Sequence, residues 1–347
     1  MGKKWTLSAR HERRSPWLVR NVNNGRLRVK LRKTYIEITT ACNLSCSFCG
    51  GTRRAPQFMD PALFARLLEQ IKGISRHLYF HVMGEPLLHP QIGRFLDLCE
   101  PYGYKVHLIT NGRLLSTAGP GLLKKPALTQ VGVSLQSFED TLSDGAMDSL
   151  LSTVRDFASR AAERGGLWVM FRLWNGGGGD PVRAGANARI LRSLERVLAL
   201  PAPLAAASGD KPVIKLTANL SLQFAPRFEW PDPSMPLVGD AGFCYGLRDQ
   251  CAILVDGTVV PCCLDRNAVM DLGSAARSPL REILEGERAD RIRKGFSRRN
   301  VVEDLCRRCT YRLRFDRLNS PPAISIGSSA GSSSAAGNRR TWGIQPS

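Results

Sequence analysis

Hydrophobic and polar residues alternate in two patterns between residues 35 and 224. Short runs rich in β-branched and aromatic residues predict strands, whereas apolar residues at every third or fourth position predict helices. The predicted strands are 35–39, 78–84, 105–110, 130–135, 167–174 and 213–224. The predicted helices are 59–73, which has Asp60 and Pro61 at its start and Gly73 at its end, then 91–103, 147–164 and 186–200.

Strands that alternate with helices are typical of parallel β–α units. A complete eight-unit barrel averages about 250 residues, and this pattern is shorter. The sequence therefore predicts an α/β fold, a partial (β/α)6 TIM-type barrel over 34–225. Shorter pieces, more turns and a second group of cysteines predict a small cysteine-rich domain over 226–319. Residues 1–33 form a predicted basic arm, and the low-complexity segment 320–347 a predicted disordered tail.

Composition narrows the class of protein. The 347 residues are 43% hydrophobic and contain no apolar run long enough to span a membrane, so we expect no membrane partner. The first residues lack the apolar core of a secretory signal. Ten cysteines without such a signal argue against a disulfide framework and in favour of metal ligands in a reducing compartment. The sequence therefore predicts a cytoplasmic protein.

The net charge of +19 is unevenly distributed. Residues 1–33 contain eleven Lys and Arg and one Glu, and residues 281–318 contain twelve Lys and Arg and seven Asp and Glu. Such clusters fit either a polyanionic partner such as RNA or basic residues that simply face solvent. The sequence leaves both alternatives open.

Three cysteines crowd into eight residues directly after the first predicted strand: Cys42, Cys46 and Cys49. A structural zinc site has four ligands, and the sequence offers no His in or immediately beside this run. Iron–sulfur clusters are usually held by four thiolates, so three would leave one iron of a [4Fe–4S] cluster open for chemistry. The run also follows a strand at the end of the barrel where active sites lie.

The spacing Cys42-x3-Cys46-x2-Cys49, with Phe48 before the last cysteine, resembles the signature of the radical SAM superfamily. The resemblance covers residues 34–225. It implies that S-adenosylmethionine binds the open iron of a [4Fe–4S] cluster and is cleaved reductively to methionine and a 5′-deoxyadenosyl radical. That radical would abstract a hydrogen atom from a substrate.

Two further segments extend the resemblance. The segment HVMGEPLLHP (81–90) resembles the Gly-Gly-Glu segment of the superfamily, with Met83 in place of the first glycine. The resemblance implies that Glu85 binds the methionine ammonium group and that Gly84 lets the backbone approach. Asn111, in the TNG segment that ends the third predicted strand, would lie near the cofactor.

Polar residues at the fourth and fifth predicted strands complete the implied cofactor site. Ser134 and Gln136 resemble the pair that reaches the ribose or the methionine carboxylate, with ordinary strand-end capping as the alternative. Arg172 is a charge inside an apolar strand, and a buried Arg needs an anionic partner. The methionine carboxylate is one candidate partner, and a salt bridge within the barrel is the other.

The second group of cysteines begins with Cys244-x12-Gly257-x4-Cys262, which resembles the start of a SPASM auxiliary-cluster extension. The run ILVDGTVVPCC predicts a hairpin that turns at Asp256-Gly257 and brings Cys262 near Cys244. A predicted helix over 278–296 would then return the chain to CRRC (306–309).

A full SPASM domain supplies seven cysteines for two clusters, whereas this chain has six after residue 240. The resemblance therefore implies one auxiliary [4Fe–4S] cluster, with zinc on the same four cysteines as the alternative. The predicted ligands are Cys244, Cys262, Cys306 and Cys309. Cys251 is expected to be a small core residue, Cys263 to face away from Cys262, and Cys99 to be buried in a helix.

Four other polar residues have simpler interpretations. We expect His81 and His89 to be satisfied residues at a strand end. Asp256 and Asp265 could face a substrate as a base, although turn formation explains Asp256 more simply. The sequence assigns no catalytic acid or base.

Together these features predict a radical SAM oxidoreductase. The favoured substrate is a peptide or protein side chain, as for many SPASM-bearing relatives, with the auxiliary cluster accepting an electron or anchoring the substrate. A flavodoxin or ferredoxin would supply the reducing electron. The alternatives are dehydrogenation or rearrangement of a small biosynthetic intermediate, tRNA modification suggested by the basic arm, and a non-catalytic iron–sulfur protein. The Glu85 segment speaks against the last.

Overall fold

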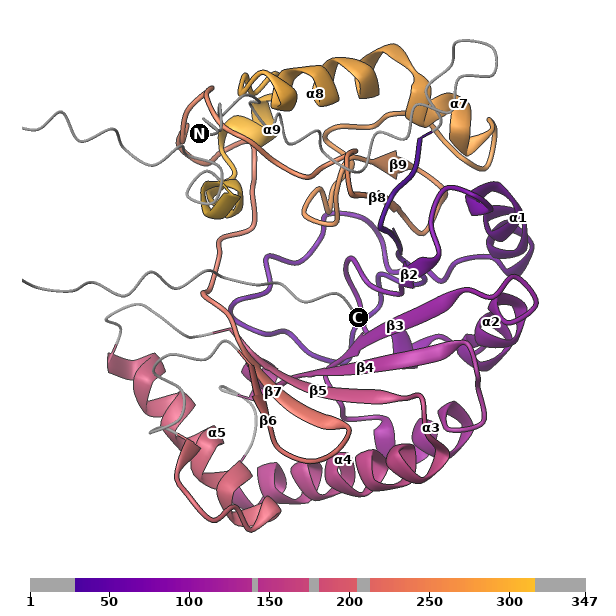
Figure 1. The fold of residues 1–347 in the computed structure, drawn as a ribbon. Coiled ribbons are helices and arrows are strands. Elements are labelled where there is room, and N and C mark those ends of the chain that lie inside the picture. Colours follow the sequence, from indigo (N-terminus) through magenta and orange to yellow (C-terminus); the bar gives the residue numbers. More distant parts are fainter. Residues whose placement is uncertain (1–28, 139–142, 175–180, 205–212, 316–347) are drawn as a thin grey trace, which may run out of the picture.

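A curved sheet with helices on its outer side organises the chain (Figure 1). The computed structural model describes residues 29–138, 143–174, 181–204 and 213–315. Most of the predicted basic arm and the whole of the predicted tail lie outside these residues. None of the helices within the described ranges is long and apolar enough to cross a membrane.

Nine strands form one sheet in the order β6-β7-β5-β4-β3-β2-β1-β8-β9. Neighbouring strands from β1 to β5 run parallel, and β5 is parallel to β7, which confirms the predicted partial barrel. These strands are β1 (Lys33–Ile36), β2 (His77–Tyr79), β3 (Lys105–Thr110), β4 (Leu128–Ser134), β5 (Trp168–Leu173) and β7 (Leu220–Phe224).

Within the described ranges, five helices and two 3-10 turns connect these strands. They are α1 (Pro61–Ile71), η1 (Pro86–Leu88), α2 (Ile92–Cys99), α3 (Leu115–Leu122), η2 (Leu135–Phe138), α4 (Asp144–Arg164) and α5 (Pro181–Leu198). Asp60 caps α1 as predicted, because its carboxylate accepts hydrogen bonds from two backbone N–H groups of the first turn. Helix α3 was not predicted, because its sequence LSTAGPGL contains two glycines and a proline.

Two predicted strands differ from the structure. The predicted strand 213–224 is a hairpin of β6 (Val213–Lys215) and β7, because Thr217 turns the chain and its hydroxyl accepts a hydrogen bond from the N–H of Leu220. The predicted strand 78–84 ends at Tyr79. The chain leaves the sheet there and reaches Gly84, whose φ of +76° is incompatible with a strand.

The sheet continues across the predicted domain boundary at residue 226. Strand β8 (Gln250–Ile253) pairs in parallel with β1, and β9 (Val259–Val260) pairs antiparallel with β8. The predicted hairpin turn is confirmed, since Gly257 has a φ of +90° and the side chain of Asp256 accepts a hydrogen bond from the N–H of Thr258. The second cysteine region therefore extends the barrel sheet beyond β1.

The predicted helix 278–296 consists of two helices that meet at Gly286, α7 (Leu280–Glu285) and α8 (Glu287–Ser297). They are followed by α9 (Asp304–Arg307) and the 3-10 turn η3 (Thr310–Arg312). In Figure 1 these elements lie on the side of the molecule opposite α4. They carry the last two cysteines of the second group.

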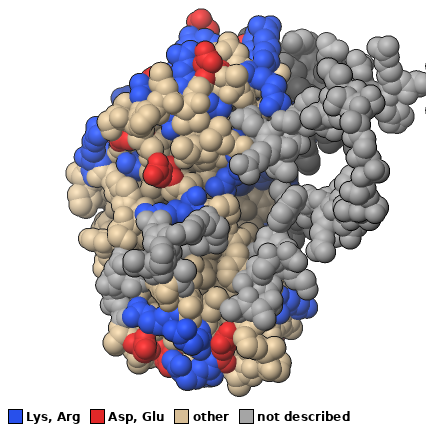
Figure 2. All heavy atoms as spheres, turned by 90° about the vertical axis from the view of Figure 1, so that its left-hand side faces the viewer, with Lys and Arg blue, Asp and Glu red and all other residues tan. Residues whose placement is uncertain are grey.

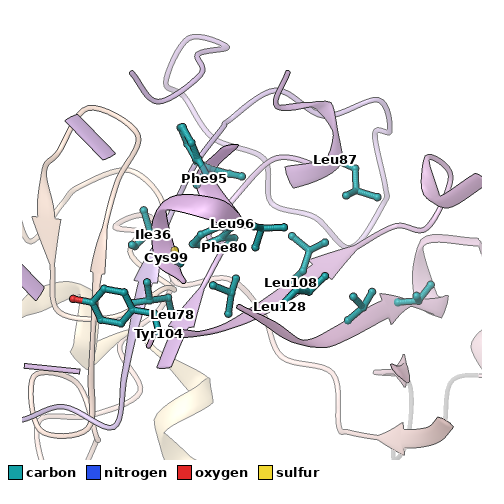
Figure 3. Close-up of a cluster of buried hydrophobic side chains, with 14 of the residues drawn as sticks. Ile36, Leu78, Phe80, Leu87, Phe95, Leu96, Cys99, Tyr104, Leu108 and Leu128 are labelled. Carbon is teal, nitrogen blue, oxygen red and sulfur yellow. The ribbon is translucent and has the colours of Figure 1, made fainter. Parts of the chain in front are cut away.

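The apolar core lies between the outer side of the sheet and the helices (Figure 3). Phe95 of α2 stacks on Phe64 of α1 with ring centroids 4.0 Å apart. Cys99 and Cys251 are fully buried in this core, as predicted. Because the core lies outside the barrel, the inner side of the sheet is left to polar and aromatic side chains. That inner side forms the candidate site.

Candidate active site

One cavity of about 610 Å³ receives residues from both cysteine groups. Cys42, Cys46 and Cys49 enter it from the loop that follows β1. The ends of β2, β3 and β4 supply further lining residues, so the cavity lies at the end of the barrel where active sites occur. The lining from the second group consists of Cys244, Cys262, Cys263, Cys306 and Cys309.

The first group of cysteines is open to solvent. Cys42 and Cys49 are exposed and Cys46 is half-buried. The loop turns between Cys46 and Cys49, because the N–H of Cys49 donates to the carbonyl of Cys46 at 3.0 Å. Three thiols that line one cavity from a single turn provide soft ligands suited to an iron–sulfur cluster.

The Glu85 segment packs directly against the chain that enters this loop. The N–H of Glu85 donates to the carbonyl of Ala41 at 2.8 Å. A Cβ added to Gly84 would lie 2.4 Å from the carbonyl oxygen of Thr39, and Gly84 also has a φ of +76°. Gly84 is thus required for this close approach between the two segments, a reason that the sequence did not reveal.

The carboxylate of Glu85 is buried and held in one orientation. One oxygen accepts hydrogen bonds from the N–H of Leu87 and the hydroxyl of Thr110, and the other accepts from the N–H of Asn111 at 2.7 Å. Burial raises the pKa of Glu85, whereas these hydrogen bonds oppose that rise. The arrangement fixes a carboxylate at the cavity wall. Its predicted contact with the methionine ammonium group stays a prediction.

Polar groups at the ends of β3 and β4 also meet at the cavity. The side-chain amide of Asn111 donates to the side chain of Asn43 at 2.8 Å, which ties the end of β3 to the cysteine loop. Ser134 and Gln136 line the cavity as well. Gln136 is 2% exposed, and its Oε1 has no hydrogen-bond partner within the described part of the chain. Such an acceptor fits a ligand with hydroxyl or ammonium donors, as S-adenosylmethionine has.

Aromatic rings form another wall of the cavity. The ring of Trp174 contacts Phe48 of the cysteine loop and Phe228, with centroid distances of 6.2 and 5.1 Å. Phe228 in turn contacts Trp230 and Tyr311. Phe48 was singled out from the sequence, whereas the other four were missed. They come from distant segments, and no local spacing connects them.

The four cysteines predicted to hold the auxiliary cluster lie together in the second region. Burial raises the pKa of Cys244 to about 12 and that of Cys262 well above its usual value. The neighbouring thiols of Cys306 and Cys309 raise the pKa of Cys262 further. Among the described residues, no three His, Cys, Asp or Glu side chains are grouped as ligands of a single metal ion.

Three of the four other polar residues named from the sequence have structural partners. His89 contacts the carbonyl of Met59 and accepts from the N–H of Gln91, as expected for a satisfied residue. Asp265 is buried, and its carboxylate accepts hydrogen bonds from two backbone N–H groups of the loop over 269–270. Asp256 shapes the hairpin turn. His81 differs, since it lines the cavity and its Nδ1 has no partner within the described residues.

A set of hydrogen bonds, here called the loop clamp, joins the first cysteine loop to the second region. The guanidinium of Arg54 binds both carboxylate oxygens of Glu37 at 2.6 Å, and its Nε donates to the carbonyl of Arg266. The hydroxyl of Thr52 donates to the side chain of Asn267 at 3.0 Å. The sequence gave no signal for the loop clamp, because its two sides are about 215 residues apart.

Two family models match the chain. Residues 36–166 match the Radical SAM superfamily, and residues 244–310 match SPASM, described as an iron-sulfur cluster-binding domain. The chain therefore contains a radical SAM domain and a SPASM domain. The first domain implies a [4Fe–4S] cluster that binds S-adenosylmethionine, and the second implies an auxiliary iron–sulfur cluster. All seven cysteines predicted as ligands lie within the matched ranges.

Relatives with curated names match a third of the chain. This chain is 32% identical over 115 residues to the tungsten-containing aldehyde ferredoxin oxidoreductase cofactor-modifying protein of Pyrococcus furiosus. The match covers 31% of this chain and 30% of that relative. The chain is 30% identical over 117 residues to the S-adenosyl-L-methionine-dependent 2-deoxy-scyllo-inosamine dehydrogenase of Niallia circulans, which covers 32% of this chain and 44% of the relative. Both matches span less than half of the relative.

Solved structures show the same fold. Streptococcus suis SuiB superimposes with a TM-score of 0.51 and 16% identity, over 77% of this chain and 68% of SuiB. At this identity the likeness shows the fold alone. It agrees with the partial barrel derived above from the strand order.

Proposed function

We propose that this protein is an enzyme that cleaves S-adenosylmethionine reductively and removes a hydrogen atom from a small organic substrate. The observation that carries the proposal is the single cavity lined by both cysteine groups. A substrate in that cavity lies between Cys42, Cys46 and Cys49 on one side and the auxiliary site on the other. Cys42, Cys46 and Cys49 would hold the [4Fe–4S] cluster, which would supply the electron that splits S-adenosylmethionine into methionine and the 5′-deoxyadenosyl radical.

The residues around the first site have distinct proposed roles. Glu85, fixed by three hydrogen bonds, presents a negative charge to the methionine ammonium group. Asn111 positions the cysteine loop through Asn43, and Gly84 allows the segment to approach that loop. The acceptor of Gln136 and the hydroxyl of Ser134 face the same cavity and suit the polar groups of the nucleoside or the methionine carboxylate.

The second site favours oxidation as the overall reaction. Removal of a hydrogen atom forms 5′-deoxyadenosine and leaves a carbon radical on the substrate. When that radical loses one proton and one electron, the substrate has been oxidised by two electrons. The auxiliary cysteines line the same cavity, which supports a role for their site as the electron acceptor. The relative named as a dehydrogenase supports this choice.

Cavity size limits the substrate. A cavity of about 610 Å³ falls in the range typical of small-molecule sites, and S-adenosylmethionine must share it. The remaining room suits either a small biosynthetic intermediate or one side chain of a peptide. We propose the small intermediate because the match to the dehydrogenase supports it. The peptide substrate favoured by the sequence becomes an outcome of the test.

Isotope transfer tests the proposal. The reconstituted enzyme, S-adenosylmethionine and a reductant such as flavodoxin are incubated anaerobically with fractions of a deuterium-labelled cell extract. We expect deuterated 5′-deoxyadenosine with the small-molecule filtrate. Deuterium transfer only from the peptide fraction would establish the peptide substrate instead. An enzyme with both cysteine sites loaded that never forms 5′-deoxyadenosine would contradict the proposed activity altogether.

RNA modification finds little support in the described surface. Figure 2 shows Lys and Arg side chains at the upper and lower ends of one face and in a band between them, with acidic side chains among them. In the second region Lys294 pairs with Asp290 at 2.6 Å, and Arg288 pairs with Glu303 at 2.7 Å. The alternative therefore rests on the basic arm, and salt-dependent tRNA binding that is lost on deletion of residues 1–28 would support it.

A further inference from the structure

The inner side of the barrel below the cavity is unusually cationic. We call this part the barrel chamber and define it by seven side chains. Lys33 and Tyr35 project from β1, and Arg172 projects from β5. Tyr35, His81, Arg172, Cys263 and Tyr311 line the cavity itself. Lys33 packs beneath them, with its Nζ 5.2 Å from the ring of Tyr35 and 5.3 Å from the ring of Tyr79.

Arg172 occupies the chamber without a counter-ion. Its guanidinium stands 5.1 Å from the ring of Trp174, which holds it in place by a cation–π contact. Within the described residues it forms no ion pair and no hydrogen bond. Lys33 likewise has no ion-pair partner there. Both side chains are half-buried, and burial lowers the pKa of each.

Acidic side chains do not supply the missing charge. Among the cavity-lining residues Glu85 is the single acid, and its oxygens are already occupied by three donors from η1 and the end of β3. The charge of Asp249 favours protonated Lys33, but Asp249 lies outside the cavity. Its carboxylate also forms an ion pair with Arg32, with an N–O distance of 3.9 Å. Buried charges in proteins are normally paired, so two such cations beside a cavity indicate that a ligand brings the anion.

We propose that the barrel chamber binds an anionic group of the substrate, a carboxylate or a phosphate, with Arg172 as its direct partner. This inference rests on the proposed function for its claim that the occupant is the substrate. The planar fork of Arg172 matches two oxygens of such a group, and Lys33 adds positive potential from below. The hydroxyls of Tyr35 and Tyr311 remain protonated, because burial raises their pKa, and can donate hydrogen bonds.

The same chemistry could come from S-adenosylmethionine, whose methionine carboxylate was the predicted partner of Arg172. The surroundings of the guanidinium favour the substrate. The groups that most favour its charged form, Tyr35, Tyr311, Cys263 and Tyr79, belong to β1, β2 and the SPASM region. An anion held here would anchor the substrate at the chamber and leave its remaining atoms in the cavity above.

Binding measurements on the reconstituted enzyme separate the two sources. Calorimetric titrations with methyl phosphate, acetate and neutral acetamide are made at constant ionic strength with S-adenosylmethionine saturating. We expect at least one anion to bind saturably and acetamide not to bind. Arg172→Gln should weaken that anion about 10-fold or more, the effect of losing a charge-assisted hydrogen bond, while the Kd of S-adenosylmethionine changes less than about 3-fold. Arg172→Lys should restore part of the loss.

Two controls make the outcome decisive. Arg281→Gln removes a half-buried charge paired with Glu285 on α7, outside the cavity, and should alter neither titration. If Arg172→Gln weakens S-adenosylmethionine about 10-fold and spares anion binding, the partner is the methionine carboxylate and the inference is wrong. It is also wrong if no anion binds the wild-type complex. Formation of 5′-deoxyadenosine without substrate is recorded in parallel, so failure of the proposed activity is seen separately from failure of the anion site.

Discussion

The two cysteine groups use the same ligand type in opposite environments. Cys42 and Cys49 are exposed on a loop at the mouth of the cavity. Cys309 is 9% exposed, and Cys244 lies deep enough that burial raises its pKa to about 12. The three ligands at the mouth leave room for a small molecule to complete the coordination. The four ligands of the second group, of which Cys309 is buried and the other three are half-buried, can complete it by themselves. The contrast parallels that between catalytic and structural zinc sites.

The environments also differ in what holds the ligands. The first loop depends on contacts from elsewhere, namely Gly84, Asn111 and the loop clamp. The second group is embedded in its own region, where the thiol of Cys306 lies 3.5 Å from the sulfur of Met270. A site at the cavity mouth, on a loop held by contacts from other segments, is suited to binding and releasing a cosubstrate. An enclosed site is suited to storing or passing an electron.

Removing each group of cysteines in turn should give the largest effects. The wild type should hold about eight irons, two clusters of four, and Cys42→Ala/Cys46→Ala/Cys49→Ala about four. That variant should lose cleavage of S-adenosylmethionine entirely. The matching variant with Cys244, Cys262, Cys306 and Cys309 changed to Ala should also hold about four irons but retain cleavage. Iron analysis and 5′-deoxyadenosine release measure both.

The metal content of the wild type checks the second half of this comparison. About four irons together with one zinc per chain would show that the enclosed site holds zinc, and an electron-accepting role for it would then be excluded. Circular dichroism controls for folding of the variants. Removal of the first cysteine group should therefore abolish cleavage of S-adenosylmethionine. Removal of the second should lower the iron content but leave cleavage intact.

The open site should also be the one sensitive to a single buried charge. Glu85→Gln keeps the shape of the side chain but removes its charge and one acceptor. A charge-assisted hydrogen bond contributes about 1.5–3 kcal/mol, so S-adenosylmethionine should bind about 10- to 150-fold more weakly. Glu69→Gln on α1, whose side chain accepts a hydrogen bond from Tyr102 at the surface, is the control. Unchanged binding in Glu85→Gln would show that the ammonium contact is wrong.

Sequence reasoning succeeded where ligands are close together along the chain. The spacing of Cys42, Cys46 and Cys49 and the turn at Asp256-Gly257 could both be interpreted locally, because each pattern lies within about a dozen residues. The alternation of strands and helices predicted the barrel for the same reason. Each parallel unit is a local repeat of strand, helix and strand.

The contacts that the sequence missed all join distant segments. Strand β8 pairs with β1 across more than 200 residues, as the partners Tyr35 and Ala252 show. The barrel chamber likewise combines Lys33, Arg172 and Tyr311, which lie far apart in the sequence. A lone Lys or Tyr in a strand carries no local signal of its partner. Only the tertiary fold brings these side chains together.

Acid should destabilise the barrel more than the SPASM region. All five histidines of the chain precede residue 108, so none lies in the SPASM region. His107 is buried in the barrel, where its Nδ1 contacts Gln130 and its Nε2 contacts His77, and burial lowers its pKa to about 4. An unfolded His has a pKa of about 6.5. At pH values between these two pKa values, His107 is protonated in the unfolded chain but not in the folded chain. The free energy of unfolding therefore falls as pH decreases.

The shift in the pKa of His107 corresponds to a loss of about 3 kcal/mol of stability between pH 6.5 and pH 4. Chemical denaturation across this pH range should show the loss, and His107→Gln should flatten the slope. Hydrogen exchange should locate the first opening in β2 and β3 rather than in α7 and α8. Equal acid sensitivity of wild type and His107→Gln would mean that another group, such as His77, carries the dependence.

The smallest expected effect comes from the loop clamp that supports the open site. The side-chain oxygen of Asn267 accepts hydrogen bonds from the hydroxyl of Thr52 and the N–H of Arg53, both at 3.0 Å. Asn267→Ala removes both, whereas the hydroxyl of Thr52 keeps its contact with the carbonyl of Arg266. We expect a loss of about 1 kcal/mol, typical of such hydrogen bonds. Amide exchange should quicken over residues 50–55, and the second site should keep its iron.

Asn219→Ala provides the matched control for this last prediction. Its side-chain amide donates to the carbonyls of Ala158 and Leu167, on the far side of the barrel from both cysteine groups. It should cost a similar stability but leave exchange over 50–55 unchanged. If Asn267→Ala instead releases iron from the auxiliary site and spares the first loop, the enclosed site depends on the open one. The second region would then be the one that depends on contacts from other segments, and the first loop would not.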